Sequence, residues 1–182
     1  MEKSMIKKVS IIIAILIATP FILALFIHNS YDVEREVVIN QPKAIVFDYL
    51  KFLKNQNEFS KWAKMDPMSK KTYRGIDGTV GFVSAWASEN EEVGTGEQEI
   101  IAINYGNRID YELRFFTPFE ATEPAYIETQ SISAEKTRVK WGFSGHMDYP
   151  MNLMFLFMDF EQVIGDDLQT GLDNLKVILE KS

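Results

Sequence analysis

The sequence predicts an α+β fold in which a curved antiparallel sheet wraps one long C-terminal helix, behind a single N-terminal transmembrane helix. Three patterns indicate this architecture. An uncharged apolar run opens the chain, strand-like segments separated by short turn signals fill its middle, and a helical apolar stripe closes it. Sheets in α+β proteins bury one face against helices, so the strands and the last helix are expected to share one core.

The opening apolar run is Val9–Ile27, 19 residues without a charge, of which thirteen are Ile, Leu, Val or Phe. As a helix it would be about 28 Å long, close to the roughly 30 Å hydrocarbon layer of a bilayer. A cleaved signal peptide is the alternative, but its apolar core is usually about 7–15 residues long and ends at small residues. The run ends instead at Leu25-Phe26-Ile27-His28-Asn29. We therefore predict an uncleaved membrane anchor over residues 1–29 and a folded domain over residues 30–182.

The charges on either side of the anchor predict its orientation. Lys3, Lys7 and Lys8 precede the apolar run, whereas the flank that follows it, residues 32–36, is acidic on balance. Positive residues favour the cytoplasmic side, so the short N-terminus is expected in the cytoplasm and the domain outside it. The sequence thus indicates a single-pass membrane protein whose partner through the N-terminal helix is the membrane.

Composition excludes several classes of function. The 182 residues can form one domain with a real core, and they include no cysteine, which rules out disulfides, thiolate nucleophiles and cysteine-based zinc sites. The formal net charge is −7, and since residues 1–29 carry +2, the domain carries about −9. Nucleic acid is not an expected partner, because phosphate contacts need clustered Lys and Arg.

The first half of the domain reads as a strand followed by two short helices. Residues 31–39 are rich in β-formers, and the Glu34-Arg35-Glu36 cluster is typical of an exposed or edge strand. Asn40-Gln41-Pro42 is a helix-start signal. A second short helix is predicted at about residues 53–62, before Asp66-Pro67 breaks the chain.

Residues 71–144 predict an antiparallel meander of about six strands, since short turns join them at regular spacing. The clearest alternation is in Arg108–Phe116, where Ile109, Tyr111 and Leu113 share one face. Residues 125–132 form a weaker strand whose inward face the pattern does not assign. The other strands are expected at about residues 72–74, 80–88, 93–103 and 137–144.

The closing helix is predicted from Pro150 to Lys181, because apolar residues recur there every three or four positions. Its length would be roughly 45 Å. Residues 153–158 are apolar all round, so its opening turns are expected to be covered on more than one side. A strongly twisted sheet that grips one helix is expected to leave a cavity between them.

Several short motifs follow one another along the domain in a recognisable order and spacing. They are Ile39–Pro42, Val46–Tyr49, Asn57–Trp62, Gly94–Gln98, Arg108–Leu113, Thr137–Trp141 and Gly171–Lys176. Together they resemble the START-like or SRPBCC superfamily, and most closely its polyketide cyclase/dehydrase and lipid transport branch. The resemblance spans about residues 31–180 and implies a helix-grip fold whose cavity, in many members, holds a lipid, sterol or polyketide. It does not imply one activity, since the fold hosts carriers, cyclases and regulators.

No catalytic motif is visible, so catalytic residues, cofactors and metals are not predicted. His146 lies beside Asp148 and Tyr149 before the last helix. It is either a surface histidine or, if it faces the cavity, a general acid or base. Glu97 and Glu99 share one face of their strand. This face is either exposed to solvent or points into the cavity, where a charge could orient the polar head of a ligand.

The expected cavity would be lined by aromatic, methionine and arginine side chains. Aromatic residues on inward strand faces are also ordinary core residues, methionines often only fill gaps, and an arginine on a strand is usually solvated. The candidates for ligand contact are Trp62, Tyr73, Trp86, Tyr111, Arg114, Trp141, Met151, Met154 and Met158.

These patterns favour a membrane-anchored domain that binds a lipid-like or other apolar small molecule. The alternatives are an enzyme of cyclase, dehydratase or hydrolase type that uses the same cavity, and a regulatory or interaction module without a ligand. An enzyme would need two or more convergent polar groups in the cavity. A module without a ligand would show a collapsed interior and a large exposed apolar patch. Protein partners are not predicted.

Overall fold

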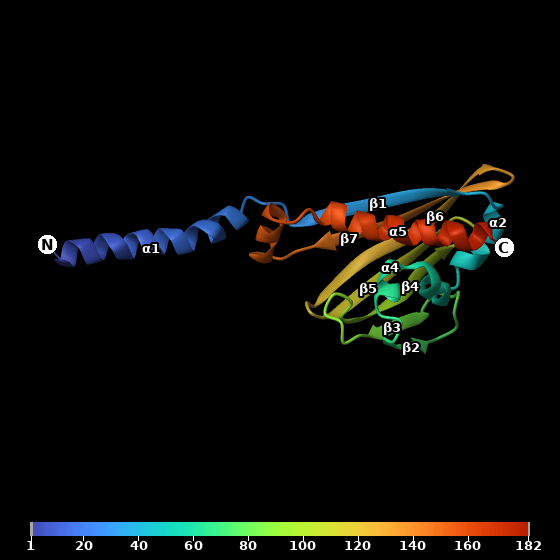
Figure 1. Cartoon of the computed structure of the whole chain (residues 1–182), viewed down its shortest axis with the longest axis horizontal. Helices are drawn as coiled ribbons and strands as arrows, with labels where there is room; N and C mark the ends of the chain where they lie inside the picture. Colours follow the sequence, from blue (N-terminus) through green and yellow to red (C-terminus); the bar gives the residue numbers. More distant parts are fainter. Residues whose placement is uncertain (1, 182) are drawn as a thin grey trace.

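The computed structural model describes residues 2–181, with side chains described from Ser4 onward (Figure 1). Its helices are α1 (Glu2–Ala24), α2 (Lys43–Leu50), α3 (Gln56–Phe59), α4 (Lys61–Met65) and α5 (Phe160–Glu180), with 3-10 turns η1 (Leu53–Asn55) and η2 (Met151–Leu156). Its strands are β1 (Ser30–Ile39), β2 (Lys70–Arg74), β3 (Val83–Ala87), β4 (Thr95–Asn104), β5 (Arg108–Thr117), β6 (Ala121–Ser133) and β7 (Lys136–His146).

The seven strands form one antiparallel sheet in the order β1-β7-β6-β5-β4-β3-β2. Strands β2 to β7 follow one another as the predicted meander, and β1 pairs with β7 as the edge strand on that side of the sheet. The charged cluster at residues 34–36 therefore lies on an edge strand, as the sequence indicates. The sheet curves around α5 (Figure 1), which confirms the predicted α+β architecture.

The core lies between the concave face of the sheet and α5. Leu168, Leu172 and Leu175 of α5 are fully buried, and they share a core with Val139 and Trp141 of β7. The helix approaches the sheet closely at Gly171, where an added Cβ would lie 2.7 Å from the Trp141 ring. Glycine is needed at this crossing because no larger residue leaves room for the indole.

The predicted C-terminal helix is divided in two, so its predicted start at Pro150 is wrong. The turn η2 ends at Leu156, and α5 begins only at Phe160. Asp159 caps α5 by accepting a hydrogen bond from the backbone N–H of Gln162 (2.9 Å). The segment between them is not covered on several sides either, since Phe157 is 87 % exposed.

Two other elements differ from prediction. The helix expected at residues 53–62 is three short pieces, η1, α3 and α4, because the chain turns at Ser60. Strand β6 begins at Ala121, four residues before its predicted start. Its buried positions are the odd-numbered ones, from Glu123 to Thr129, which settles the face that the sequence left unassigned.

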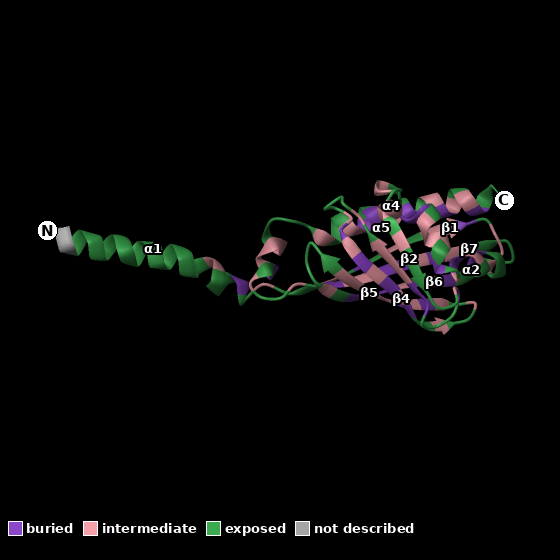
Figure 2. Cartoon of the chain, turned by 90° about the horizontal axis from the view of Figure 1, so that it is seen from below, coloured by how far each residue is buried: buried purple, intermediate pink, exposed green. Residues whose placement is uncertain are grey.

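Helix α1 extends away from the domain and is exposed along nearly its whole length (Figure 2). Its Ser4–Ala24 segment has a mean hydropathy of 2.2, and it is long and apolar enough to cross a membrane. An N-terminal signal sequence would share these two properties. Only residues 25–29 connect α1 to β1, so the domain begins directly at the end of this helix.

Candidate ligand cavity

A cavity of about 960 Å³ lies between the concave face of the sheet and the helices α3 to α5. This volume is at the upper end of the roughly 300–1,000 Å³ that small-molecule sites occupy. Its wall is mostly apolar and rich in aromatic rings. The sheet contributes alternate residues, because successive side chains of a strand point to opposite faces. Those residues include Trp86 of β3, Gln98 of β4, Leu113 and Phe115 of β5, and Trp141 and Phe143 of β7.

Five of the nine predicted contact residues line this cavity: Trp62, Trp86, Trp141, Met151 and Met154. The first three come from α4, β3 and β7, and the methionines come from η2. Trp62 and Trp141 meet edge to face, with ring centroids 6.4 Å apart. The tertiary structure thus brings together residues that lie up to 92 positions apart in the sequence, counted from Trp62 to Met154.

The other four predicted residues are not among the residues that line this cavity. Tyr111 is a fully buried core residue, and Met158 is exposed after η2. Tyr73 stacks on Phe82 beside the cavity, with ring centroids 6.1 Å apart. Strand alternation places Arg114 on the convex face of the sheet, opposite Leu113 and Phe115.

Arg114 is the centre of an ion-pair network on that convex face. It donates to Glu97 (2.8 Å), Glu99 (2.7 Å) and Glu112, which the β4–β5 register places around it. Burial alone would raise the pKa of Glu97, but hydrogen bonds from Arg74 and Arg114 outweigh it and hold the pKa below its usual value. These charges pair with one another and supply nothing to the cavity.

Glu123 is the cavity residue that the sequence analysis missed. It is only 7 % exposed, it lines the cavity, and its Oε1 accepts a hydrogen bond from the backbone N–H of His146 (2.9 Å). Burial raises the pKa of this carboxyl group, and the negative charge of Asp148 adds to the effect. Among the described residues, the bond from the His146 N–H is the only hydrogen bond to the Glu123 carboxyl group, and it leaves Oε2 without a protein donor.

Glu123 belongs to a small polar group at one end of the cavity. The Tyr31 ring lies near it, and burial, together with the Glu123 charge, raises the pKa of Tyr31 to about 12. The phenol therefore stays protonated at neutral pH. His146 also lines the cavity, as the sequence hypothesis required, but its ring is half exposed and its Nε2 lies 3.2 Å from Asp148 Oδ1 rather than beside the Glu123 carboxyl group.

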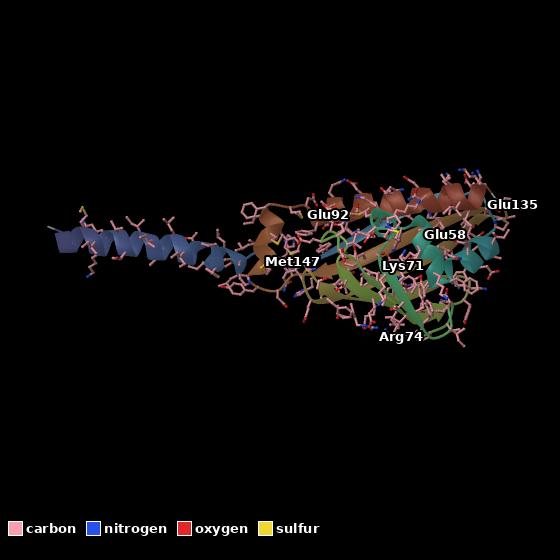
Figure 3. The ribbon with its side chains drawn as sticks, turned by 60° about the horizontal axis from the view of Figure 1, so that its bottom comes forward. Glu58, Lys71, Arg74, Glu92, Glu135 and Met147 are labelled. Carbon is pink, nitrogen blue, oxygen red and sulfur yellow. The ribbon has the colours of Figure 1, made fainter. Side chains whose placement is uncertain are left out.

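The cavity opens at the end of the domain nearest to α1. The exposed residues of its wall come from three segments, Glu92, residues 117–122 and residues 146–151, whereas the rest of the wall is buried or half-buried. Figure 3 shows Glu92 and Met147 at the α1 end of the domain, and Glu135 at the opposite end. We call these three segments the cavity mouth. Glu123 and Tyr31 lie just inside it.

The sequence matches no protein-family model and no curated protein. Solved structures do match its fold. A protein of Thermobifida fusca, determined by solution NMR, is 20 % identical, with 82 % of this chain and 93 % of that chain covered and a TM-score of 0.57. Ara h 8.0201 is 15 % identical over 84 % of this chain and 99 % of its own, with a TM-score of 0.59. The chain has the START-like, helix-grip fold.

A third structure extends the likeness of this START-like domain. It is the di-domain ARO/CYC StfQ from the steffimycin biosynthetic pathway, which is 8 % identical with a TM-score of 0.64. The match covers 84 % of this chain and 51 % of the di-domain protein. Structural matches at identities this low show the fold alone, and this fold is the one that the sequence motifs resemble. The function has to be argued from the cavity.

Proposed function

We propose that this START-like domain binds an amphiphilic, lipid-like small molecule in its cavity and that α1 anchors it to a membrane. The observation that carries the proposal is the mostly apolar cavity of about 960 Å³ with a buried carboxyl group just inside its mouth. The wall suits a hydrocarbon or ring system, and the carboxyl group suits one polar end.

The apolar part of the guest is favoured by the size and lining of the cavity. At about 30 Å³ per water molecule, the space corresponds to roughly thirty waters. Trp62, Trp86 and Trp141 offer those waters few hydrogen bonds. When the apolar part of a ligand displaces these water molecules, the free energy of binding gains about 25 cal/mol for each Å² of apolar surface removed from water. A long alkyl chain or a fused ring system is therefore the expected body of the ligand.

The polar end of the guest is defined by Glu123. Oε1 accepts a hydrogen bond from the backbone N–H of His146, which leaves Oε2 as an acceptor on a residue that lines the cavity. Ligands that present a hydrogen-bond donor, such as a hydroxyl or an amine, satisfy this oxygen. A free carboxylate at the same place would repel it, since two like charges within contact distance are unfavourable.

The membrane location is supported by the length, hydropathy and exposure of α1. The lysines in the first turns of α1, before its apolar run, favour a cytoplasmic N-terminus, which leaves the domain on the other side of the membrane. With only residues 25–29 as a link, the domain would stay next to the bilayer. Intact-mass measurement of the membrane fraction tests this, because a cleaved signal sequence would remove α1 from the mature protein.

A lipid-uptake measurement on the full chain in lipid nanodiscs tests ligand binding. The protein is expected to take up a fluorescent fatty alcohol and to release lipid-like molecules in native mass spectrometry. The Ala125→Phe variant, which places a ring in the cavity, is expected to lose uptake. The Ala102→Phe variant is the matched control, because Ala102 is exposed and lies outside the cavity. Equal uptake by both variants, or no uptake by the unmodified chain, would contradict the proposal.

Catalysis in the same cavity is the second candidate, because Glu123 and His146 both line it. Binding is favoured over catalysis because the two groups do not act together: the imidazole of His146 pairs with the exposed Asp148, and Glu123 contacts only the backbone N–H of His146. A bound molecule whose mass changes during incubation with the full chain would decide for an enzyme. A module without a ligand is disfavoured by the open interior.

A further inference from the structure

An uncharged apolar segment, residues 149–158, follows β7 at the α1 end of the domain. We call it the collar. It contains η2 and carries no charged side chain. Its exposed large apolar residues are Tyr149, Met151, Leu156, Phe157 and Met158. A run of this kind on a surface marks an interaction site, because single exposed apolar residues are common but contiguous ones are not.

The collar is attached to the end of α1. The side-chain amide of Asn152 donates to the carbonyl oxygens of Ala24 (2.8 Å) and Ile27 (3.0 Å), and both Asn152 and Ala24 are buried. The rings of His28 and Phe155 lie 4.6 Å apart, which extends this contact. The last turn of the apolar helix and the collar therefore form one continuous surface.

The collar overlaps the cavity mouth at residues 149–151 and contributes to the cavity wall beyond it. Met151 and Met154 line the cavity from η2, and Phe119, on the β5–β6 connection, is an exposed apolar residue of the same wall. An exposed apolar rim is unfavourable in water, whereas it fits the boundary between lipid headgroups and acyl chains. The mouth lies at the end of the domain that joins α1 (Figure 3), so the exposed apolar residues of the collar lie at that same end.

We propose that the collar inserts into the headgroup region of the bilayer and seats the cavity mouth on the membrane, so that the ligand passes between lipid and cavity without crossing water. This inference rests on the proposed function, because α1 determines where the bilayer lies. We infer a lipid surface as the binding partner of the collar, because the collar contacts the end of the proposed membrane anchor α1. Asp148 and Asp159 flank the collar, so zwitterionic lipid suits it better than anionic lipid.

Fluorescent labelling of single positions tests the insertion. The chain contains no cysteine, so one introduced cysteine carries one environment-sensitive label. Full-length Phe157→Cys, Leu23→Cys and Ile76→Cys variants would be labelled in phosphatidylcholine nanodiscs. Leu23 reports on α1, and Ile76 is an exposed apolar residue between β2 and β3, outside the collar and mouth. Quenching by nitroxide-labelled lipid and by aqueous iodide is compared for each position.

The label at Phe157 is expected to be quenched by the lipid nitroxide and protected from iodide, with the opposite result at Ile76. A label at Phe157 that iodide quenches, while the label at Leu23 senses lipid, overturns the collar insertion and leaves the tether intact. Protection from both quenchers at Phe157 also overturns it, since a protein surface would then cover the collar. An aqueous label at Leu23 overturns the tether and the insertion together.

Exchange kinetics supply a second readout. The Phe157→Asp variant is expected to take up fluorescent fatty alcohol from the surrounding bilayer on the order of tenfold more slowly, because a carboxylate resists the headgroup–acyl boundary. Val177→Asp is the matched control, an exposed apolar position on α5 outside the collar. Equal rates for the two variants would contradict the inference even if the label at Phe157 senses lipid.

Discussion

Replacing Glu123 by glutamine isolates the proposed contact with the polar end of the ligand. Glutamine has nearly the same size, and its carbonyl oxygen can still accept the backbone N–H of His146 that Oε1 accepts at 2.9 Å. The second oxygen becomes an NH₂ group, which carries no charge and cannot accept a hydrogen bond. The substitution therefore keeps the fold and removes the acceptor that faces the cavity.

The expected loss of affinity follows from the burial of this group. A hydrogen bond to a charged partner contributes about 1.5–3 kcal/mol. Glu123 is 7 % exposed as a residue, so we apply this range to its contact with the ligand. The loss corresponds to a Kd that is roughly 10- to 150-fold weaker for ligands with a donor at their polar end. A ligand without a donor should not bind the variant more weakly, because the glutamine NH₂ group removes no partner from it.

Competition with a fluorescent fatty alcohol measures this difference on the full chain in nanodiscs. Hexadecanol and hexadecylamine should compete less well for the Glu123→Gln variant than for the unmodified chain, and methyl palmitate should compete at least as well for the variant. Glu120→Gln is the matched control, because Glu120 is an exposed carboxylate of the mouth. Unchanged affinity for the alcohol and the amine would refute the reasoning, and so would an equal loss for the ester.

Three further predictions concern stability. Because burial raises the pKa of Glu123 above its ordinary 4.5, the folded state holds the proton more tightly, and this stabilisation is present at low pH and is lost as the pH rises through the folded pKa. In thermal melting, the Glu123→Gln variant should therefore have a higher Tm than the unmodified chain at about pH 8, and no higher Tm at about pH 4. Gly171→Ala should cost about 1–3 kcal/mol in urea unfolding, because its Cβ meets the Trp141 ring at 2.7 Å. Gly165→Ala, which meets only the movable end of an arginine, should cost less than about 1 kcal/mol, and equal losses would count against this packing. Asn152→Ala removes two hydrogen bonds that together contribute about 1–3 kcal/mol. The rate of amide hydrogen exchange in residues 147–158 should therefore rise about 5- to 150-fold. An unchanged exchange rate in this segment would refute the attachment of the collar to α1.

Local patterns in the sequence predicted most of the fold. Period-two alternation placed Ile109, Tyr111 and Leu113 on the inward face of β5, and turn signals separated the strands of the meander. The break before α5 was also present in the sequence, since Asp159 and Gln162 have the spacing of a helix cap. It was missed because the apolar stripe runs unbroken through the cap, and hydrophobic periodicity does not register where a helix begins.

The candidate site was decided by contacts between distant segments. Alternation predicts only that Arg114 and its neighbours in β5 point to opposite faces of the sheet. The curvature of the whole sheet determines that the face with Arg114 is the convex one, where the ion-pair network forms. Glu123 is buried because β6 starts earlier than its β-formers suggest, and because the backbone of His146, 23 positions away, supplies its hydrogen bond.

By itself, then, the sequence determined the order of helices and strands, the apolar N-terminal helix and the aromatic residues available for a cavity wall. These follow from spacing along the chain, which is a local property. Only the tertiary structure decided that about 960 Å³ stays open between sheet and α5 and that its mouth faces α1. An open volume is the difference between the space that a curved sheet encloses and the volume of the side chains inside it, and both quantities depend on every element at once.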